Sequence, residues 1–120
     1  MRSTVEKGRW AEAHASRHLQ SKGYRVVEKN FRCKRGEIDL IVERDGVLCF
    51  VEVKARRSQD FGGALLAVDV HKQRRVAAAA EIFLALKPHD GPCRFDVVTL
   101  MKEAGRWRVS HLENAYEAGG

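Results

Sequence analysis

The chain has 120 residues, of which 44% are hydrophobic and 32% charged, and a formal net charge of +6. This length suits one compact domain, and a chain of this size and composition needs neither disulfides nor a structural metal to fold. No apolar run approaches the roughly 20 residues of a membrane span, and the N-terminal residues lack the apolar core of a signal peptide. We therefore expect a cytoplasmic protein with no membrane partner.

The net charge and the spacing of the cysteines indicate which kinds of partner and site to expect. A basic balance favours anionic partners such as nucleic acid or an anionic membrane surface. The three cysteines, Cys33, Cys49 and Cys93, are widely spaced and form no CxxC pair, which indicates neither a disulfide framework nor a zinc site.

The first half of the chain predicts one helix and three strands. Residues 4–22 carry an apolar stripe at helical spacing and end at a glycine. An apolar, β-branched run over 24–31 predicts a strand. Two more strands, 36–43 and 47–55, are joined through Asp45-Gly46, a strong hairpin signal.

The second half predicts a polar loop over 56–63, a helix over 65–86, and strands over 94–101 and 106–113. The order αβββαββ predicts an α/β domain in which helices flank a mixed β-sheet. We expect residues 1–116 to form this single domain and 117–120 to be a flexible tail. The residues of the second helix expected to face the core are Val76, Ala79, Ala80 and Phe83.

The predicted hairpin gathers acidic residues on one face. With a two-residue turn, Asp39 lies opposite Glu52 and Glu37 opposite Lys54, and a three-residue loop would weaken this register. Alternation puts these four side chains on one face. The other face is expected to be entirely apolar, from Ile38, Leu40, Val42, Val47, Cys49, Val51 and Val53.

Two carboxylates directly opposed on a sheet destabilise it, and a cation between them removes the cost. Mg²⁺ suits such a site, since it binds one or two carboxylates together with water and substrate phosphate. Lys54 projects from the same face, where it could orient or help deprotonate an attacking water. The alternative is a cross-strand ion pair of Glu37 with Lys54 and solvated acids. The apolar pair Ile41 and Phe50 on the same face argues against it, because partly covered carboxylates need a partner.

The motifs of the hairpin and of its neighbouring segments resemble those of a known group of proteins. Asp39 followed by Glu52-Val53-Lys54 resembles the D…ExK arrangement of the PD-(D/E)xK nuclease superfamily, which has the restriction-endonuclease-like fold. The segments GRWAEAHASRHLQSKGY, NFRCKRGEIDLI, FVEVKAR, HKQRR and RFDVV resemble, in this order and spacing, the YraN-like family of small bacterial proteins. That family is similar in architecture to archaeal Holliday-junction resolvases.

The resemblance implies a restriction-endonuclease-like fold and a metal-dependent nuclease. It implies that Asp39 and Glu52 are ligands of Mg²⁺ or Mn²⁺, that the carbonyl of Val53 completes the site, and that Lys54 is the catalytic lysine. Glu12 matches an acid that many members contribute from the first helix, and a solvated boundary charge is its alternative. By analogy with the resolvases, a homodimer is expected.

Three basic clusters flank this acidic set and are expected to contact phosphates of DNA. They lie before the hairpin, after its second strand and on the second helix; a solvated face is the alternative for each. The residues chosen from them are Arg35, Arg56, Arg57, Lys72 and Arg75.

Other candidates are weaker. His14 and His18 are one helical turn apart, but no nearby acid or cysteine completes a zinc set. Asp96 is interpreted as a structural hydrogen-bond acceptor in preference to a site residue. The leading hypothesis is a nuclease that acts on DNA, including branched or structured forms. The alternatives are a nucleic-acid-binding module that works with a repair or uptake partner, and a structural interaction subunit.

Overall fold

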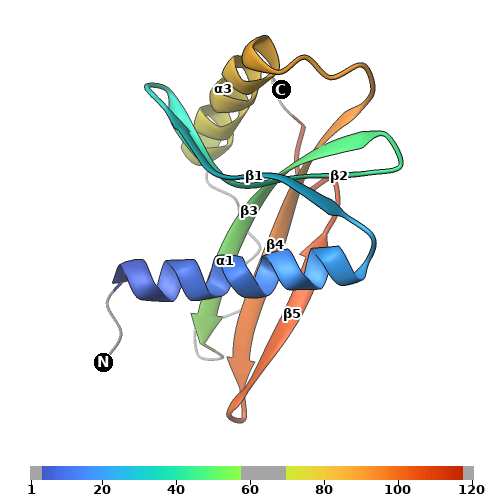
Figure 1. Ribbon diagram of the computed structural model, residues 1–120. Coiled ribbons are helices and arrows are strands. Elements are labelled where there is room, and N and C mark those ends of the chain that lie inside the picture. Colours follow the sequence, from blue (N-terminus) through green and yellow to red (C-terminus); the bar gives the residue numbers. More distant parts are fainter. Residues whose placement is uncertain (1–3, 58–69, 118–120) are drawn as a thin grey trace.

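The computed structural model describes residues 4–57 and 70–117. The element order is the predicted αβββαββ, and two helices flank a five-stranded sheet (Figure 1). The elements are α1 (Thr4–Ser21), β1 (Arg25–Cys33), β2 (Gly36–Arg44), β3 (Val47–Arg57), α3 (Val70–Leu86), β4 (Cys93–Glu103) and β5 (Arg106–Leu112). The predicted Phe61-Gly62-Gly63 loop, the first residues of the predicted 65–86 helix and the tail beyond Glu117 lie outside the described residues.

The sheet is mixed, as predicted. Its strands follow one another in chain order, β1-β2-β3-β4-β5. β3 and β4 are parallel, and every other neighbouring pair is antiparallel. A parallel pair needs a long crossover connection, usually helical, and α3 lies in this one.

The hairpin turn sets the register of β2 and β3. Asp45 and Gly46 have φ values of 52° and 80°, the positive values that a type I′ turn requires at both central positions. The pairing runs from Arg44 with Val47 to Leu40 with Val51, which confirms the two-residue turn.

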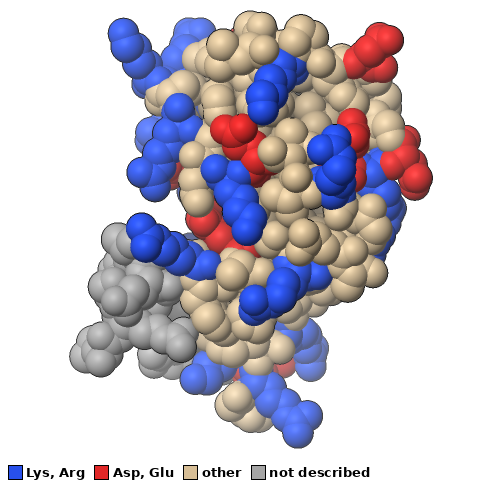
Figure 2. All heavy atoms as spheres, in the orientation of Figure 1, with Lys and Arg blue, Asp and Glu red and all other residues tan. Residues whose placement is uncertain are grey.

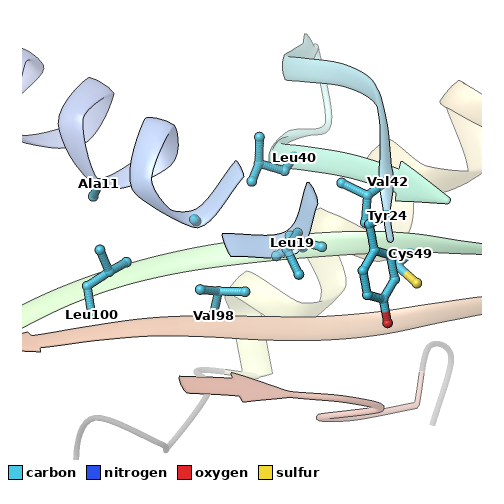
Figure 3. Close-up of a cluster of buried hydrophobic side chains, with 10 residues drawn as sticks. Ala11, Leu19, Tyr24, Leu40, Val42, Cys49, Val98 and Leu100 are labelled. Carbon is cyan, nitrogen blue, oxygen red and sulfur yellow. The ribbon is translucent and has the colours of Figure 1, made fainter. Parts of the chain in front are cut away.

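α1 covers one face of the sheet. Ala11, Ala15 and Leu19 pack on Leu40, Val42, Cys49, Val51, Val98 and Leu100, together with Tyr24 (Figure 3). Each of these side chains is buried. The apolar stripe predicted on the first helix is therefore the surface that attaches α1 to the sheet.

α3 covers part of the opposite face. Its predicted core residues, Val76, Ala79, Ala80 and Phe83, pack with Ile41, Leu48 and Phe50. The face that carries the acidic residues is thus partly covered, as the Ile41–Phe50 pair indicated.

Ile38 corrects the predicted division of the two faces. It was expected on the Leu40 face, but it packs in the α3 cluster. Past Leu40, β2 pairs only with β1, where Ile38 lies opposite Phe31. A two-stranded ribbon twists more strongly than a wide sheet, so flat alternation of side chains does not hold across this point.

Several strands extend beyond their predicted ends. Arg56 and Arg57, expected in a loop, belong to β3, because β4 continues to pair with them as far as Lys102. Within the described residues, no helix combines the length and apolar character needed to cross a membrane.

Candidate active site

The acidic residues meet where β2 and β3 separate. The β2–β3 ladder ends at Leu40 and Val51, one pair short of the expected Asp39–Glu52 pair. Instead, the backbone N–H of Val53 donates a hydrogen bond of 2.8 Å to Oδ2 of Asp39. The Asp39 side chain therefore takes the place of a main-chain acceptor and is fixed at the fork between the two strands.

Glu52 is the most enclosed acid of the group. It is only 4% exposed. Its Oε1 lies 3.7 Å from Nζ of Lys54 and 3.8 Å from Nζ of Lys72, whereas Oε2 is buried and has no hydrogen-bond partner among the described residues. One oxygen of this carboxylate thus lies near two ammonium groups, and the other is buried without a hydrogen-bond partner among the described residues.

Burial makes the charge of Asp39 costly. It is the main reason that the pKa of Asp39 is raised, and the nearby charges of Glu52 and Glu37 raise it further. The hydrogen bond from Val53 and the charge of Lys72 oppose this shift without cancelling it. Asp39 is therefore a carboxylate whose charged form is disfavoured in the folded protein, chiefly because it is buried.

Glu12 lies beside this group. Burial raises its pKa, and the charge of Asp39 is the next cause, which shows that α1 brings Glu12 towards the fork. The side chain of Asn30 donates a hydrogen bond that partly offsets the shift. Glu12 is thus half-buried, and the charge of Asp39 acts on it.

Glu37 has a different partner from the one considered in the alternative interpretation. It pairs across the β1–β2 ladder with Arg32, at 3.3 Å between Nε and Oε2, and about half of its side chain is exposed. Lys54 pairs with Glu52 and is 12% exposed. The simple surface pair of Glu37 with Lys54 therefore does not account for the face.

The basic candidates lie in three places. Lys72, expected only at the phosphate backbone, contacts Glu52 itself. Arg56 is exposed near the end of β3, while the side chain of Arg57 lies outside the described part of the chain. Arg35 and Arg75 are exposed where the β1–β2 turn meets α3. On the face of the molecule that is turned to the viewer, Figure 2 shows acidic side chains interspersed with lysine and arginine side chains.

Tyr116, the last residue of the expected domain, was not predicted to lie near the site. Its ring stacks on Phe95 with 5.2 Å between centroids, and the N–H of Ala115 donates a hydrogen bond of 2.7 Å to the Phe95 carbonyl. Burial, and next the charge of Glu52, raises the pKa of the Tyr116 hydroxyl. The segment thus carries an aromatic side chain to the neighbourhood of Glu52, and no local pattern in the sequence signals that contact.

Asp96 belongs to a separate network on the α1 side of the sheet. It is fully buried and accepts hydrogen bonds from Arg94, His111 and the backbone N–H of Asn114. Arg94 also donates to the hydroxyl of Tyr24. The interpretation of Asp96 as a structural acceptor is therefore confirmed.

The histidines of α1 do not form a metal pair. His14 packs against Trp10, with 4.4 Å between ring centroids. Across residues 4–57 and 70–117, no three histidine, cysteine, aspartate or glutamate side chains form a group that could hold a metal ion. A divalent ion at the fork would therefore depend on two carboxylates, a carbonyl and water.

Comparison with known proteins identifies the family. Residues 11–100 match the model of a family described as "Uncharacterised protein family UPF0102". A UPF0102 protein of Alcanivorax borkumensis is 50% identical over 100 residues, covering 82% of this chain and 80% of the relative. A UPF0102 protein of Chlorobium chlorochromatii is 42% identical over 120 residues, covering 95% and 93% of the two chains. The chain therefore belongs to UPF0102, the YraN-like family that its motifs indicated.

Proposed function

We propose that this member of UPF0102 is a Mg²⁺- or Mn²⁺-dependent nuclease that hydrolyses phosphodiester bonds in DNA, including branched or structured DNA. The observation that carries the proposal is Glu52. A carboxylate that is 4% exposed and leaves Oε2 without a partner among the described residues is costly unless another group binds it.

The residues at the fork fit a hard divalent cation. Such ions bind carboxylate, carbonyl and water oxygens, and Mg²⁺ often takes only one or two carboxylates from the protein. Asp39 and Glu52 would supply carboxylates and Val53 its backbone carbonyl. When bound, the ion would supply positive charge to a phosphate oxygen and acidify a coordinated water.

Lys54 and Glu12 would orient the attacking water and accept its proton. Lys54 is nearly buried, and its ammonium is held by Glu52, so it can orient the attacking water and stabilise negative charge on the phosphorane. Hydrolysis forms a bond from the water oxygen to phosphorus and breaks the bond from phosphorus to the leaving oxygen. The raised pKa of Glu12 favours it as the group that accepts the proton of the water.

The basic side chains around the fork would hold the DNA backbone. Arg56 extends along the same strand as Glu52 and Lys54, and Arg35 and Arg75 are exposed beside α3. Contacts to phosphate position a nucleic acid without reading its sequence. Recognition would therefore depend on DNA shape, or on a second subunit such as the other half of a homodimer.

One observation favours a second candidate, a nucleic-acid-binding module without turnover. The described residues lack a three-ligand metal group of histidine, cysteine or acidic side chains. A module that works only through phosphate contacts needs no metal, and its DNA affinity would survive the loss of Glu52.

The test is cleavage of labelled duplex, single-stranded, flap and four-way-junction DNA with Mg²⁺ or Mn²⁺. The unmodified protein would be compared with Glu52→Gln, which keeps the shape of the side chain and removes its charge. Lys87→Met is a matched control, because it removes the charge of an exposed lysine that pairs with Glu28 elsewhere on the molecule.

The nuclease predicts cutting by the unmodified protein and by Lys87→Met, and none by Glu52→Gln. Equal cutting by all three would identify a contaminating enzyme and contradict the proposal. Firm, salt-sensitive binding with no cutting in any metal would favour the binding module instead.

A further inference from the structure

Glu52 has two cationic partners that differ in how firmly they are held. Both Lys54 and Lys72 place Nζ within 4 Å of the same oxygen, Oε1. The side chain of Lys54 is 12% exposed, whereas that of Lys72 is 50% exposed. Lys54 also comes from the strand that carries Glu52, while Lys72 reaches it from α3.

The two lysines lower the free-energy cost of burying the charge of Glu52. An uncompensated carboxylate buried as deeply as Glu52 is expensive, and one ammonium beside it lowers that cost. Lys72 brings a second ammonium to the same oxygen, at 3.8 Å. Two cations from two different elements thus share one buried carboxylate.

A half-exposed lysine is suited to leave this position. Its ammonium can regain full hydration by a rotation of its long side chain, while Lys54 stays beside Glu52. A divalent cation brings twice the charge and bonds directly to carboxylate oxygen. Lys72 and such an ion therefore compete for the same negative charge.

We propose that Lys72 is an internal counter-ion, which holds Glu52 when no divalent ion is bound and is displaced when the ion binds. The inference rests on the proposed function in that it requires a metal site at the fork. Displacement frees the Lys72 ammonium beside the site, where a phosphate of the substrate is its natural new partner. Metal binding thereby prepares the site to bind DNA.

Metal affinity in the absence of DNA tests the proposal. Mn²⁺ would be titrated into the unmodified protein, Lys72→Met and Lys87→Met, with free Mn²⁺ followed by its electron paramagnetic resonance signal. Lys87→Met is matched because Lys87, like Lys72, is a half-exposed lysine paired with a glutamate, at 3.7 Å from Glu28.

Removal of the competing charge should tighten Mn²⁺ binding in Lys72→Met by roughly fivefold, the size expected for a half-exposed ion pair. Lys87→Met should stay within about twofold of the unmodified protein. Lys87 follows the last residue of α3, roughly 22 Å along the helix from Lys72 at about 1.5 Å per residue, and charges more than a Debye length away are screened. Lys72→Arg, which keeps the charge, should not show the tightening.

Equal or weaker Mn²⁺ binding by Lys72→Met would overturn the counter-ion role. That result leaves the nuclease proposal to the cleavage assay, which does not depend on the sign of this effect. If no protein of the set binds Mn²⁺, the counter-ion is also overturned, and the metal-dependent nuclease fails with it.

Discussion

Asp39 is held at a position where its charge costs free energy. Its pKa is raised, mainly by burial, so the folded protein binds the proton more tightly than the unfolded chain does. The sign follows from linkage. The penalty grows as the pH rises from the ordinary carboxyl range through the raised pKa, and it is relieved as the pH falls again. Buried charges with a raised pKa are typical of functional sites, where the binding of a ligand offsets the free-energy cost of burial.

Asp39→Asn should therefore stabilise the metal-free protein at pH 7. The asparagine oxygen can still accept the hydrogen bond from Val53, while the buried charge is gone. We expect the midpoint of thermal unfolding to rise by roughly 2–4 °C, which corresponds to somewhat under 1 kcal/mol in a domain of this size. Differential scanning calorimetry in EDTA would measure it, and an unchanged or lower midpoint would contradict this account of the site.

The residues of the site differ in how far sequence could predict them. One turn and the alternation along two strands were enough to bring Asp39, Glu52 and Lys54 together, although the expected Asp39–Glu52 pair is replaced by the hydrogen bond from Val53 to Asp39. The contact of Lys72 with Glu52 joins residues 20 positions apart on two elements, and Tyr116 reaches the neighbourhood of Glu52 through stacking on Phe95. Such contacts depend on how α3 and the C-terminal segment pack, and no local pattern encodes that.

At the scale of elements, the position of α3 depends on its contact with the β1–β2 turn. A Cβ added at Gly36 would lie 2.3 Å from the carbonyl oxygen of Arg75, so no larger residue fits without movement of the backbone. This close approach holds α3 against the β1–β2 turn. It therefore also helps to set the distance from Lys72 to Glu52.

Gly36→Ala should destabilise the protein by about 1–3 kcal/mol, as expected when a close-packed contact is overfilled. Gly8→Ala is the matched control: Gly8 lies in α1 with nothing within 4 Å of its added Cβ. That change should be neutral or stabilising by up to about 1 kcal/mol, because alanine favours a helix. Urea unfolding would measure both, and equal effects of the two changes would show that the Gly36 contact is unimportant.

The elements themselves were largely predictable. The Asp45-Gly46 turn and the apolar alternation gave the register of β2 and β3, which the structure confirms from Leu40 to Val51. The prediction was wrong where pairing changes: the twist of β2 past Leu40 turned Ile38 to α3, and pairing with β4 extended β3 through Arg57. The strand propensity of a segment does not indicate how far a neighbouring strand continues to pair with it.

At the scale of the whole molecule, Asp96 joins segments that are distant in the sequence. Its carboxylate binds Arg94 on β4, His111 on β5 and the backbone after β5, and Arg94 reaches Tyr24 after α1. Burial alone would raise the pKa of Asp96. The hydrogen bonds from His111, Arg94 and Asn114 outweigh burial and lower that pKa from 3.8 to about 2.

Acid should therefore weaken the whole fold in a defined range. Because the folded-state pKa is depressed, the stabilisation is complete above pH 3.8 and is lost as the pH falls towards about 2. The Asp96 contribution should amount to about 2 kcal/mol. Urea unfolding from pH 5 to pH 2 would measure it, with Asp96→Asn as the comparison. The variant should be less stable at pH 5 and lose less on acidification; parallel pH profiles of the two proteins would contradict the role of the network.

The central claim is that one acidic fork, served by Lys54, cuts DNA that the basic surface binds. The most direct measurement is cleavage by the unmodified protein and by Lys54→Met, at concentrations that give equal fractions of bound DNA. The account predicts that Lys54→Met cuts at least about 100-fold more slowly, the scale of a lost acid–base or charge-stabilising group, with DNA affinity changed by no more than a few-fold. Equal cutting rates at equal binding would contradict it and remove Lys54 from the chemistry.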